Sequence, residues 1–172
     1  MNQLKTISSN KSLVLPERKN TVCSLAITAG DGAAATVEIF SGKIGVVATA
    51  QVAVGGTLYA VGDEITLEDG YGETSATFLV ETVDTPETGV VTALTLVDGG
   101  DGYDAGIYAT TSNSVDGTNL TIEVLTVTDA DACGKVAAVA GTSEQLKFNA
   151  DIDGGISARI TGTDAKAYLL HK

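Results

Sequence analysis

The sequence predicts an all-β protein, in which a small β-barrel or sandwich forms a base domain and a second, acidic β-domain is inserted into it. Valine, threonine and isoleucine occur in short runs punctuated by glycine, aspartate and asparagine, a pattern typical of strands and tight turns. No segment keeps the apolar spacing of an amphipathic helix over a useful length. All ten lysines and arginines lie before residue 50 or after residue 133, which indicates two bodies of different charge.

The strands follow one another with few long connections. Residues 22–28 alternate in side-chain character, Gly30-Asp31-Gly32 provides a turn, and residues 35–40 resume the alternation, so we expect a hairpin here. Residues 106–118 are rich in Ser, Thr, Asn and Gly and are expected to be a long connection. Further strands are expected at residues 57–61, 64–67, 74–83, 90–97, 120–127, 135–139, 144–148, 156–161 and 165–170.

The charge pattern also predicts the domain boundaries. Residues 51–131 hold 15 of the 22 acidic residues and no basic residue, and are expected to form the inserted acidic β-domain. Residues 21–50 and 132–172 form the discontinuous base domain, because insertion at a loop tip is tolerated when the ends of the insert are close. Residues 1–20 carry four basic residues against one acid and are expected to form an extended N-terminal arm.

Composition excludes several classes of function. The net charge of −12 repels phosphate backbones and anionic lipid, so neither nucleic acid nor a membrane is an expected partner. No apolar run approaches the roughly 20 residues of a spanning helix, and the first ten residues lack the apolar core of a signal peptide, so we expect a soluble protein made in the cytoplasm. One histidine and two cysteines leave little for acid–base or metal chemistry. We therefore expect no cofactor and no enzymatic activity.

Both parts of the chain show a resemblance to virus structural modules. Residues 22–42 (VCSLAITAGDGAAATVEIFSG), with residues 134–170 and their closing Gly-Ile-x-Ala-x-Ile-Thr-Gly-Thr-x-Ala turn, resemble the small β-barrel proteins of tailed-phage virions. The insert resembles another module of phage structural proteins through residues 59–67 (YAVGDEITL), 76–83 and 90–103, which end in Asp-Gly-Gly-Asp-Gly-Tyr. The resemblance implies a capsid decoration or cement protein on the outer surface of the shell, bound to the major capsid protein. Tail, adaptor and fibre proteins use similar modules, so a host-contacting component is the alternative.

The N-terminal arm is the segment expected to bind the shell. Its basic side chains are expected to pair with acidic groups on a shell subunit. Its apolar residues, Leu13, Val14 and Leu15, are expected to add buried apolar area or a strand at the edge of a neighbouring sheet. A solvated terminus is the alternative. A trimer at a local three-fold position is the expected oligomer, because closed cyclic symmetry matches such a site. The expected capsid-binding residues are Lys5, Lys11, Leu13, Val14, Leu15, Arg18 and Lys19.

Two groups of carboxylates are candidates for chemistry. Asp98, Asp101 and Asp104 lie three residues apart on a glycine-rich segment, a pattern that can supply oxygen ligands to Ca²⁺. The alternative is a turn whose carboxylates bond the local backbone, because a single copy of the motif is weak evidence for calcium. The pairs Asp63-Glu64 and Glu68-Asp69 could serve glycan cleavage, but a solvated acidic rim is favoured because the insert has few aromatic side chains to stack on a sugar.

The two cysteines bracket the insert. Cys23 and Cys133 would be close if residues 21–28 pair with residues 135–139, and a disulfide would then be possible. Reduced thiols are favoured, because a protein made in a reducing cytoplasm usually keeps them.

Overall fold

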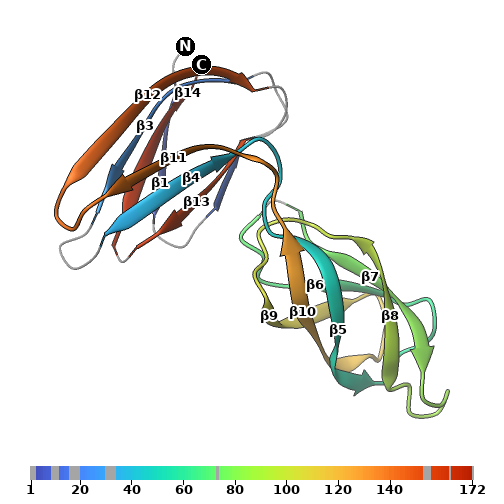
Figure 1. Ribbon diagram of the computed structural model, residues 1–172. Coiled ribbons are helices and arrows are strands. Elements are labelled where there is room, and N and C mark those ends of the chain that lie inside the picture. The colour runs from blue at the N-terminus through green and yellow to red at the C-terminus, as the bar shows by residue number, and fades with distance from the viewer. Residues whose placement is uncertain are drawn as a thin grey trace. The chain divides into compact units, whose positions relative to one another are not determined.

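The computed structural model confirms the all-β prediction and contains no helix in the part of the chain that it describes (Figure 1). Two compact units divide the chain: Met1–Lys43 with Asp129–Lys172, which we call the terminal unit, and Ile44–Thr128, which we call the barrel. The division at Lys43 follows the last basic residue before the acidic segment. The structure describes residues 3–8, 12–15, 20–29, 34–72, 74–152, 156–162 and 164–171.

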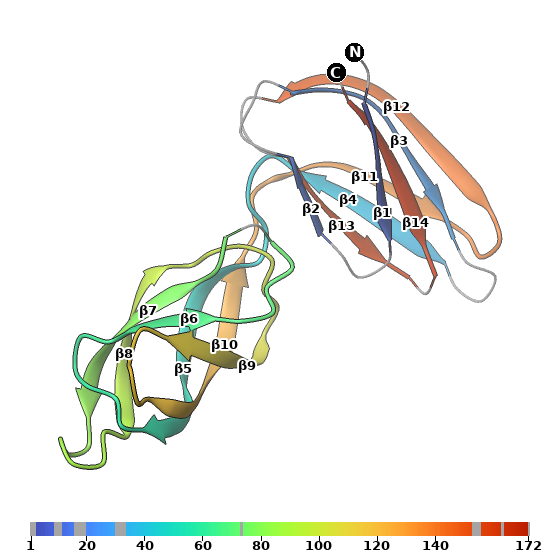
Figure 2. The same cartoon turned by 180° about the vertical axis from the view of Figure 1, so that it is seen from behind.

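The terminal unit is a sandwich of two four-stranded antiparallel sheets (Figures 1 and 2). One sheet has the order β1 (Gln3–Ser8), β14 (Lys166–His171), β3 (Asn20–Thr28), β12 (Ser143–Ile152). The other has the order β11 (Ala132–Ala138), β4 (Ala35–Phe40), β13 (Ile156–Thr161), β2 (Ser12–Leu15).

Small and β-branched side chains from both sheets fill the sandwich core. Val37 and Ile39 of β4 alternate inward, and Ile27 of β3 meets them from the first sheet. In β4 this alternation buries Val37 and Ile39 and leaves Thr36 and Glu38 partly exposed on the other face, as expected for a strand of a packed sheet. The described core residues of this unit are Ile27, Ala29, Ala35, Val37, Ile39, Val136, Ala138, Ala158, Ile160, Ala165 and Ala167.

The predicted hairpin of residues 22–28 and 35–40 is wrong. Strand β3 pairs with β12 and β14 in one sheet, whereas β4 pairs with β11 and β13 in the other. Alternation reports which face of a strand is buried but not which strand is its neighbour, and here both strands bury that face in one shared core.

The first twenty residues, expected as an extended arm, contain two strands of the sandwich. Strand β1 pairs antiparallel with β14, and β2 pairs antiparallel with β13. Each is the last strand of its sheet on that side. The segment is therefore tied to the terminal unit along two sheet edges.

The barrel consists of six antiparallel strands that nearly close on themselves. Their order is β5 (Val46–Thr57), β10 (Thr118–Thr128), β9 (Gly106–Ser112), β6 (Glu64–Leu67), β7 (Thr77–Val83), β8 (Val91–Asp98). Strand β8 returns beside β5, where the Val47 N–H donates to the Gly99 carbonyl at 2.9 Å. The core comprises Val47, Tyr59, Ile65, Leu67, Ala76, Phe78, Val80, Val91, Tyr103, Leu120, Ile122 and Val124.

Three predictions for the barrel strands fail. The strand expected at residues 57–61 is absent, because β5 ends at Thr57 and a turn follows in which the Asp63 N–H donates to the Ala60 carbonyl at 3.1 Å. The long connection expected at residues 106–118 contains β9, and β5 itself was not anticipated. Half of the residues of β5 are valine or threonine, but Gly55 and Gly56 interrupt the alternation near its end. Gly55 is needed where Val91 approaches within 2.6 Å of the site that a Cβ would occupy.

The barrel is built from two similar halves. Gly45 and Gly89 lie 44 residues apart, as do Tyr59 and Tyr103, and the contacts are reciprocal: the Tyr59 N–H donates to the Gly89 carbonyl and the Tyr103 N–H to the Gly45 carbonyl, both at 3.0 Å. The β10–β5 and β7–β8 ladders share one register, with irregularities at equivalent positions. Further identical pairs at this spacing are Val46 and Val90, Val47 and Val91, Gly55 and Gly99, Gly56 and Gly100, Val80 and Val124, and Val83 and Val127.

The repeat makes the barrel a pseudo-two-fold structure. The glycines of each pair share backbone conformations, with φ of 64° and 57° at Gly45 and Gly89 and of 61° and 58° at Gly56 and Gly100. Among the described strands, β5 forms a ladder with β10 and β8 forms a ladder with β7, so each half supplies a strand to the ladder of the other half. The two halves therefore interlock and form one core.

Candidate functional site

The expected shell-binding residues lie on the edges of the terminal unit where the structure describes them. Lys5 is in β1, opposite Leu169 of β14, and Leu13, Val14 and Leu15 are in β2. Both strands end the order of their sheets, so each offers one backbone edge that no described strand pairs with. Such edges can receive a strand from another protein. Lys11, Arg18 and Lys19 lie outside the described residues.

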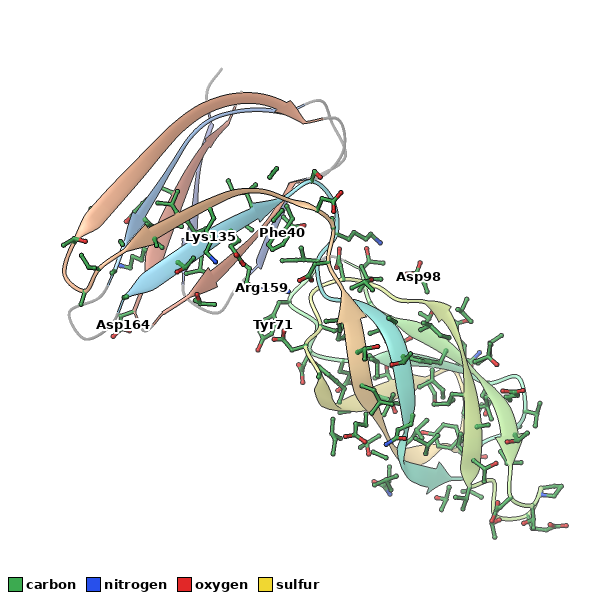
Figure 3. All side chains as sticks on the ribbon, viewed as in Figure 1. Phe40, Tyr71, Asp98, Lys135, Arg159 and Asp164 are labelled. Atoms are coloured by element: carbon green, nitrogen blue, oxygen red, sulfur yellow. The ribbon has the colours of Figure 1, made fainter. Side chains whose placement is uncertain are left out.

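The outer face of the second sheet carries ion pairs in one cross-strand row. Lys135 of β11 lies opposite Glu38 of β4, with 2.8 Å between Nζ and Oε1, and Glu38 lies opposite Arg159 of β13. Arg159 binds both carboxylate oxygens of Asp129, at 2.7 and 2.9 Å, and stacks 5.5 Å from the centre of the Phe40 ring (Figure 3). A bidentate arginine pair is geometrically specific, so it fixes Asp129 at the place where the chain re-enters the sandwich.

The two segments that lead out of and back into the terminal unit are bonded to each other. The Ser41 N–H donates to the Asp131 carbonyl at 3.1 Å, and the Ala130 N–H donates to the Lys43 carbonyl at 2.9 Å. These bonds continue the pairing of β4 with β11. The ends of the inserted segment are thus adjacent, as an insertion at one loop requires.

The candidate calcium ligands take part in a turn. Asp98 accepts the Gly100 N–H at 2.8 Å within its own turn, and the buried Asp101 accepts the N–H of Thr74, in the loop between β6 and β7, at 2.9 Å. Asp104 is exposed. No group of three or more His, Cys, Asp or Glu side chains in the described ranges is arranged to hold a metal ion.

The internal repeat explains why this glycine-rich segment exists. Gly99, Gly100 and Tyr103 recur as Gly55, Gly56 and Tyr59, but Asp101 has no acidic counterpart because Thr57 stands in its place. The recurring part is therefore the framework of glycines and a buried tyrosine rather than the carboxylates.

Tyr103 fixes the loop that follows β6. Its hydroxyl accepts the Ala76 N–H at 3.0 Å and donates to the Leu67 carbonyl at 3.3 Å. Burial raises the pKa of this phenol, and the ring contacts Tyr108 edge-on at 5.3 Å. The Cβ site of Gly70 lies 2.8 Å from the same ring, so only glycine lets the loop cover it.

The paired acids around β6 lie in a turn and at the surface of the barrel. Asp63 accepts the Ala60 N–H at 2.8 Å within its own turn, and the backbone N–H of Glu64 donates to the Asn113 side chain at 2.8 Å. Glu68 and Asp69 are exposed. Nearby, Asp84 has its pKa lowered by hydrogen bonds, first from the Thr88 hydroxyl and then from backbone N–H groups.

The disulfide between Cys23 and Cys133 is not formed. Cys133 is a free thiol at an irregularity of β11, where its S–H donates to the Ile39 carbonyl at 3.4 Å. Cys23 is in β3, which belongs to the other sheet and does not pair with β11. Partial burial raises the pKa of the Cys133 thiol, which keeps the thiol protonated at neutral pH and slows its reactions.

Sequence reasoning missed the exposed apolar residues of the barrel. Ten large hydrophobic side chains of residues 44–128 are exposed to solvent. The repeat is a signal that could have drawn attention to them, because each of these positions has an equivalent in the other half where a different side chain stands. These residues are Val54, Leu58, Val61, Tyr71, Leu79, Leu96, Val97, Ile107, Val115 and Leu125.

Comparisons with known proteins give no family. Over the residues that the structure describes, no helix is long and apolar enough to cross a membrane. No protein-family model, curated protein or solved structure matches the chain.

Proposed function

We propose that this protein is a non-enzymatic decoration, or cement, protein of a tailed-phage capsid, which binds the outer surface of the assembled shell and bridges neighbouring subunits. The resemblance of residues 22–42 and 134–170 to phage virion barrels supports the proposal, as does the division of the chain into two units. The terminal unit binds the shell and the barrel is presented to solvent.

The observation that carries the proposal is the separation of charge between the two units. All ten basic residues belong to the terminal unit, which also contains nine acidic residues, whereas the barrel contains 13 acidic residues and no basic residue. An acidic shell surface attracts the first unit and repels the second, so the charge pattern selects which unit docks. The edges of β1 and β2 then offer backbone for strand addition.

Binding alone supplies the function. A protein that binds the assembled shell but not its separated subunits stabilises assembly by mass action, by about 2.7 kcal/mol per site when its free concentration is 100 times Kd. The partner is the major capsid protein. A homotrimer suits a local three-fold position of the lattice, and native mass spectrometry of the free protein tests that part of the proposal.

The first experiment is the copy number per particle, measured by quantitative mass spectrometry of purified virions against the major capsid protein. Hundreds of copies are expected for a protein on the capsid lattice. About a dozen or fewer would overturn the proposal, because that number fits the tail or portal axis.

A charge-reversal pair tests the docking segment. The Lys5→Glu/Lys19→Glu variant is expected to lose most of its occupancy on the shell. The Lys43→Glu/Lys166→Glu variant changes the net charge by the same amount at exposed positions elsewhere in the terminal unit and is expected to keep its occupancy. Equal losses would show that net charge, rather than residues 1–20, controls binding.

The alternative is a tail, adaptor or fibre component that contacts the host surface. The exposed apolar residues of the acidic barrel favour it, because a surface that only repels would not need them. It predicts a low copy number together with binding of the full-length protein to host cells.

A further inference from the structure

The two ends of the barrel share equivalent backbone positions but differ in side chains. The 44-residue repeat relates position 58 to 102, position 61 to 105, and position 71 to 115. A direct comparison of the two ends is therefore possible within one chain. One end carries Gly102, Ala105 and Tyr71, and the opposite end carries Leu58, Val61 and Val115.

We call Leu58, Val61 and Val115 the apolar tip. One hydrogen bond links the segments of the first and last of them: the Ser114 hydroxyl, next to Val115 in the chain, donates to the Leu58 carbonyl at 3.4 Å. The Leu58 N–H donates to the Thr88 carbonyl at 2.9 Å. Val61 begins the turn that follows Tyr59 and Ala60. The tip thus belongs to the end of the barrel where β5 finishes and β10 begins (Figure 2).

The tip is unfavourable for the stability of the barrel in two independent ways. Leu58 has a φ of 64°, a left-handed conformation that residues with a Cβ rarely adopt, and its counterpart Gly102 has a φ of 77°. The side chains are also exposed to water, by 53% at Leu58, 64% at Val61 and 96% at Val115. Strained backbone and exposed apolar groups concentrate at binding surfaces, because there a partner compensates for them.

The charges around the tip define what can cover it. Glu64, Glu87 and Asp116 are exposed on the segments that carry or adjoin the tip, and residues 44–128 contain no lysine or arginine. A second copy of the barrel would bring 13 further acids against these and is repelled. We propose that the apolar tip docks into an apolar pocket ringed by lysine or arginine side chains on a partner protein. This inference does not depend on the capsid proposal.

A basic amphipathic peptide of leucine and lysine, with its leucines on one face, is the probe. Fluorescence anisotropy with the full-length protein is expected to show saturable 1:1 binding, and the same peptide with every lysine replaced by glutamate is expected not to bind. The Leu58→Ser/Val115→Ser variant should bind at least tenfold more weakly. The control is Tyr71→Ser/Val97→Ser, which removes two exposed hydrophobic side chains (55% and 59% exposed, against 53% and 96% for Leu58 and Val115) from the barrel outside the tip and should bind like the parent.

A second variant separates lost binding from lost folding. Leu58→Gly removes the side chain and relieves the left-handed strain, so its thermal midpoint should stay close to that of the parent while its affinity falls. Equal affinity of the tip variant and its control would overturn the proposal, because binding would then rest on charge alone. Absence of saturable binding, or tip-dependent binding to phosphatidylcholine vesicles instead of the peptide, would overturn it as well.

Discussion

Replacing Gly55 or Gly99 with alanine should open the seam between β5 and β8. A Cβ on Gly55 would lie 2.5 Å from Val90 Cγ1 and 2.6 Å from the Val91 carbonyl oxygen. A Cβ on Gly99 would lie 2.6 Å from Val46 Cγ1 and 2.6 Å from the carbonyl oxygen of its own partner on β5, Val47. Because optimal contacts are about 3.5 Å or longer, the backbone of the neighbouring strand must move by about 1 Å in either variant.

The expected loss of unfolding free energy follows from overpacking, and its equality in the two variants follows from the two-fold repeat. Overpacking of this kind costs about 1–3 kcal/mol, so each variant should lose about 2 kcal/mol of unfolding free energy, and the two losses should be nearly equal. Urea unfolding measures the loss directly. The thermal midpoint should fall by about 4–8 °C if the whole chain unfolds together, and by about twice that if the barrel unfolds alone.

Gly106→Ala is the matched control on a barrel strand. Its Cβ would meet only Tyr108 Cε2, at 4.0 Å, so the change should be within about 0.5 kcal/mol of zero. A loss at Gly106 equal to that at Gly55 would refute the contact argument. Losses at Gly55 and Gly99 that differ by more than about 2 kcal/mol would refute the equivalence of the two halves.

Three further outcomes are expected. Tyr103→Phe should lower the free energy of unfolding in urea by about 1–3 kcal/mol, because it leaves the buried Ala76 N–H and the Leu67 carbonyl without the hydroxyl that they bond. No loss would mean that water replaces the hydroxyl. Asp84 has a lowered pKa in the folded state, so its stabilisation is present above the unfolded value of about 3.8 and disappears as the pH falls through the folded value. The thermal midpoints of the parent and Asp84→Asn should accordingly differ at pH 7 and approach each other as the pH falls through the folded value. Cys133 should be alkylated slowly at pH 7 and faster as the pH rises above 9, because its pKa is raised; complete resistance in the unfolded, unreduced protein would indicate a disulfide.

Local sequence patterns predict strands well where one face of the strand is buried. The expected bounds at Glu64–Leu67 and Ile156–Thr161 coincide with β6 and β13, because turn residues bracket a short alternating run. Pairing depends on contacts between distant residues, so the same patterns failed for β3 and β4. Alternation is identical for a strand that pairs with its neighbour in sequence and for one that faces it across a core.

Glycine-rich strands and turns are where local reasoning fails. Gly55 reads as a break in an alternating strand, yet it lies where β8 passes too close for any side chain. The segment from Asp98 to Asp104 reads as a cation site when its carboxylates are considered alone. At both places the requirement for glycine is set by contacts with a part of the barrel that is distant in the sequence.

The repeat supplies the missing non-local information, because an interlocked two-fold barrel imposes the same requirements twice. Positions that the framework needs, such as Gly45 with Gly89 and Tyr59 with Tyr103, are identical in both halves. At positions without such a requirement the residues of the two halves can differ. A residue that makes the barrel less stable than its counterpart would must be present for a reason other than folding. Leu58 is such a residue, since its counterpart shows that glycine satisfies the backbone there. Comparing each surface residue with its counterpart in the other half therefore helps to separate residues present for binding from residues present for folding.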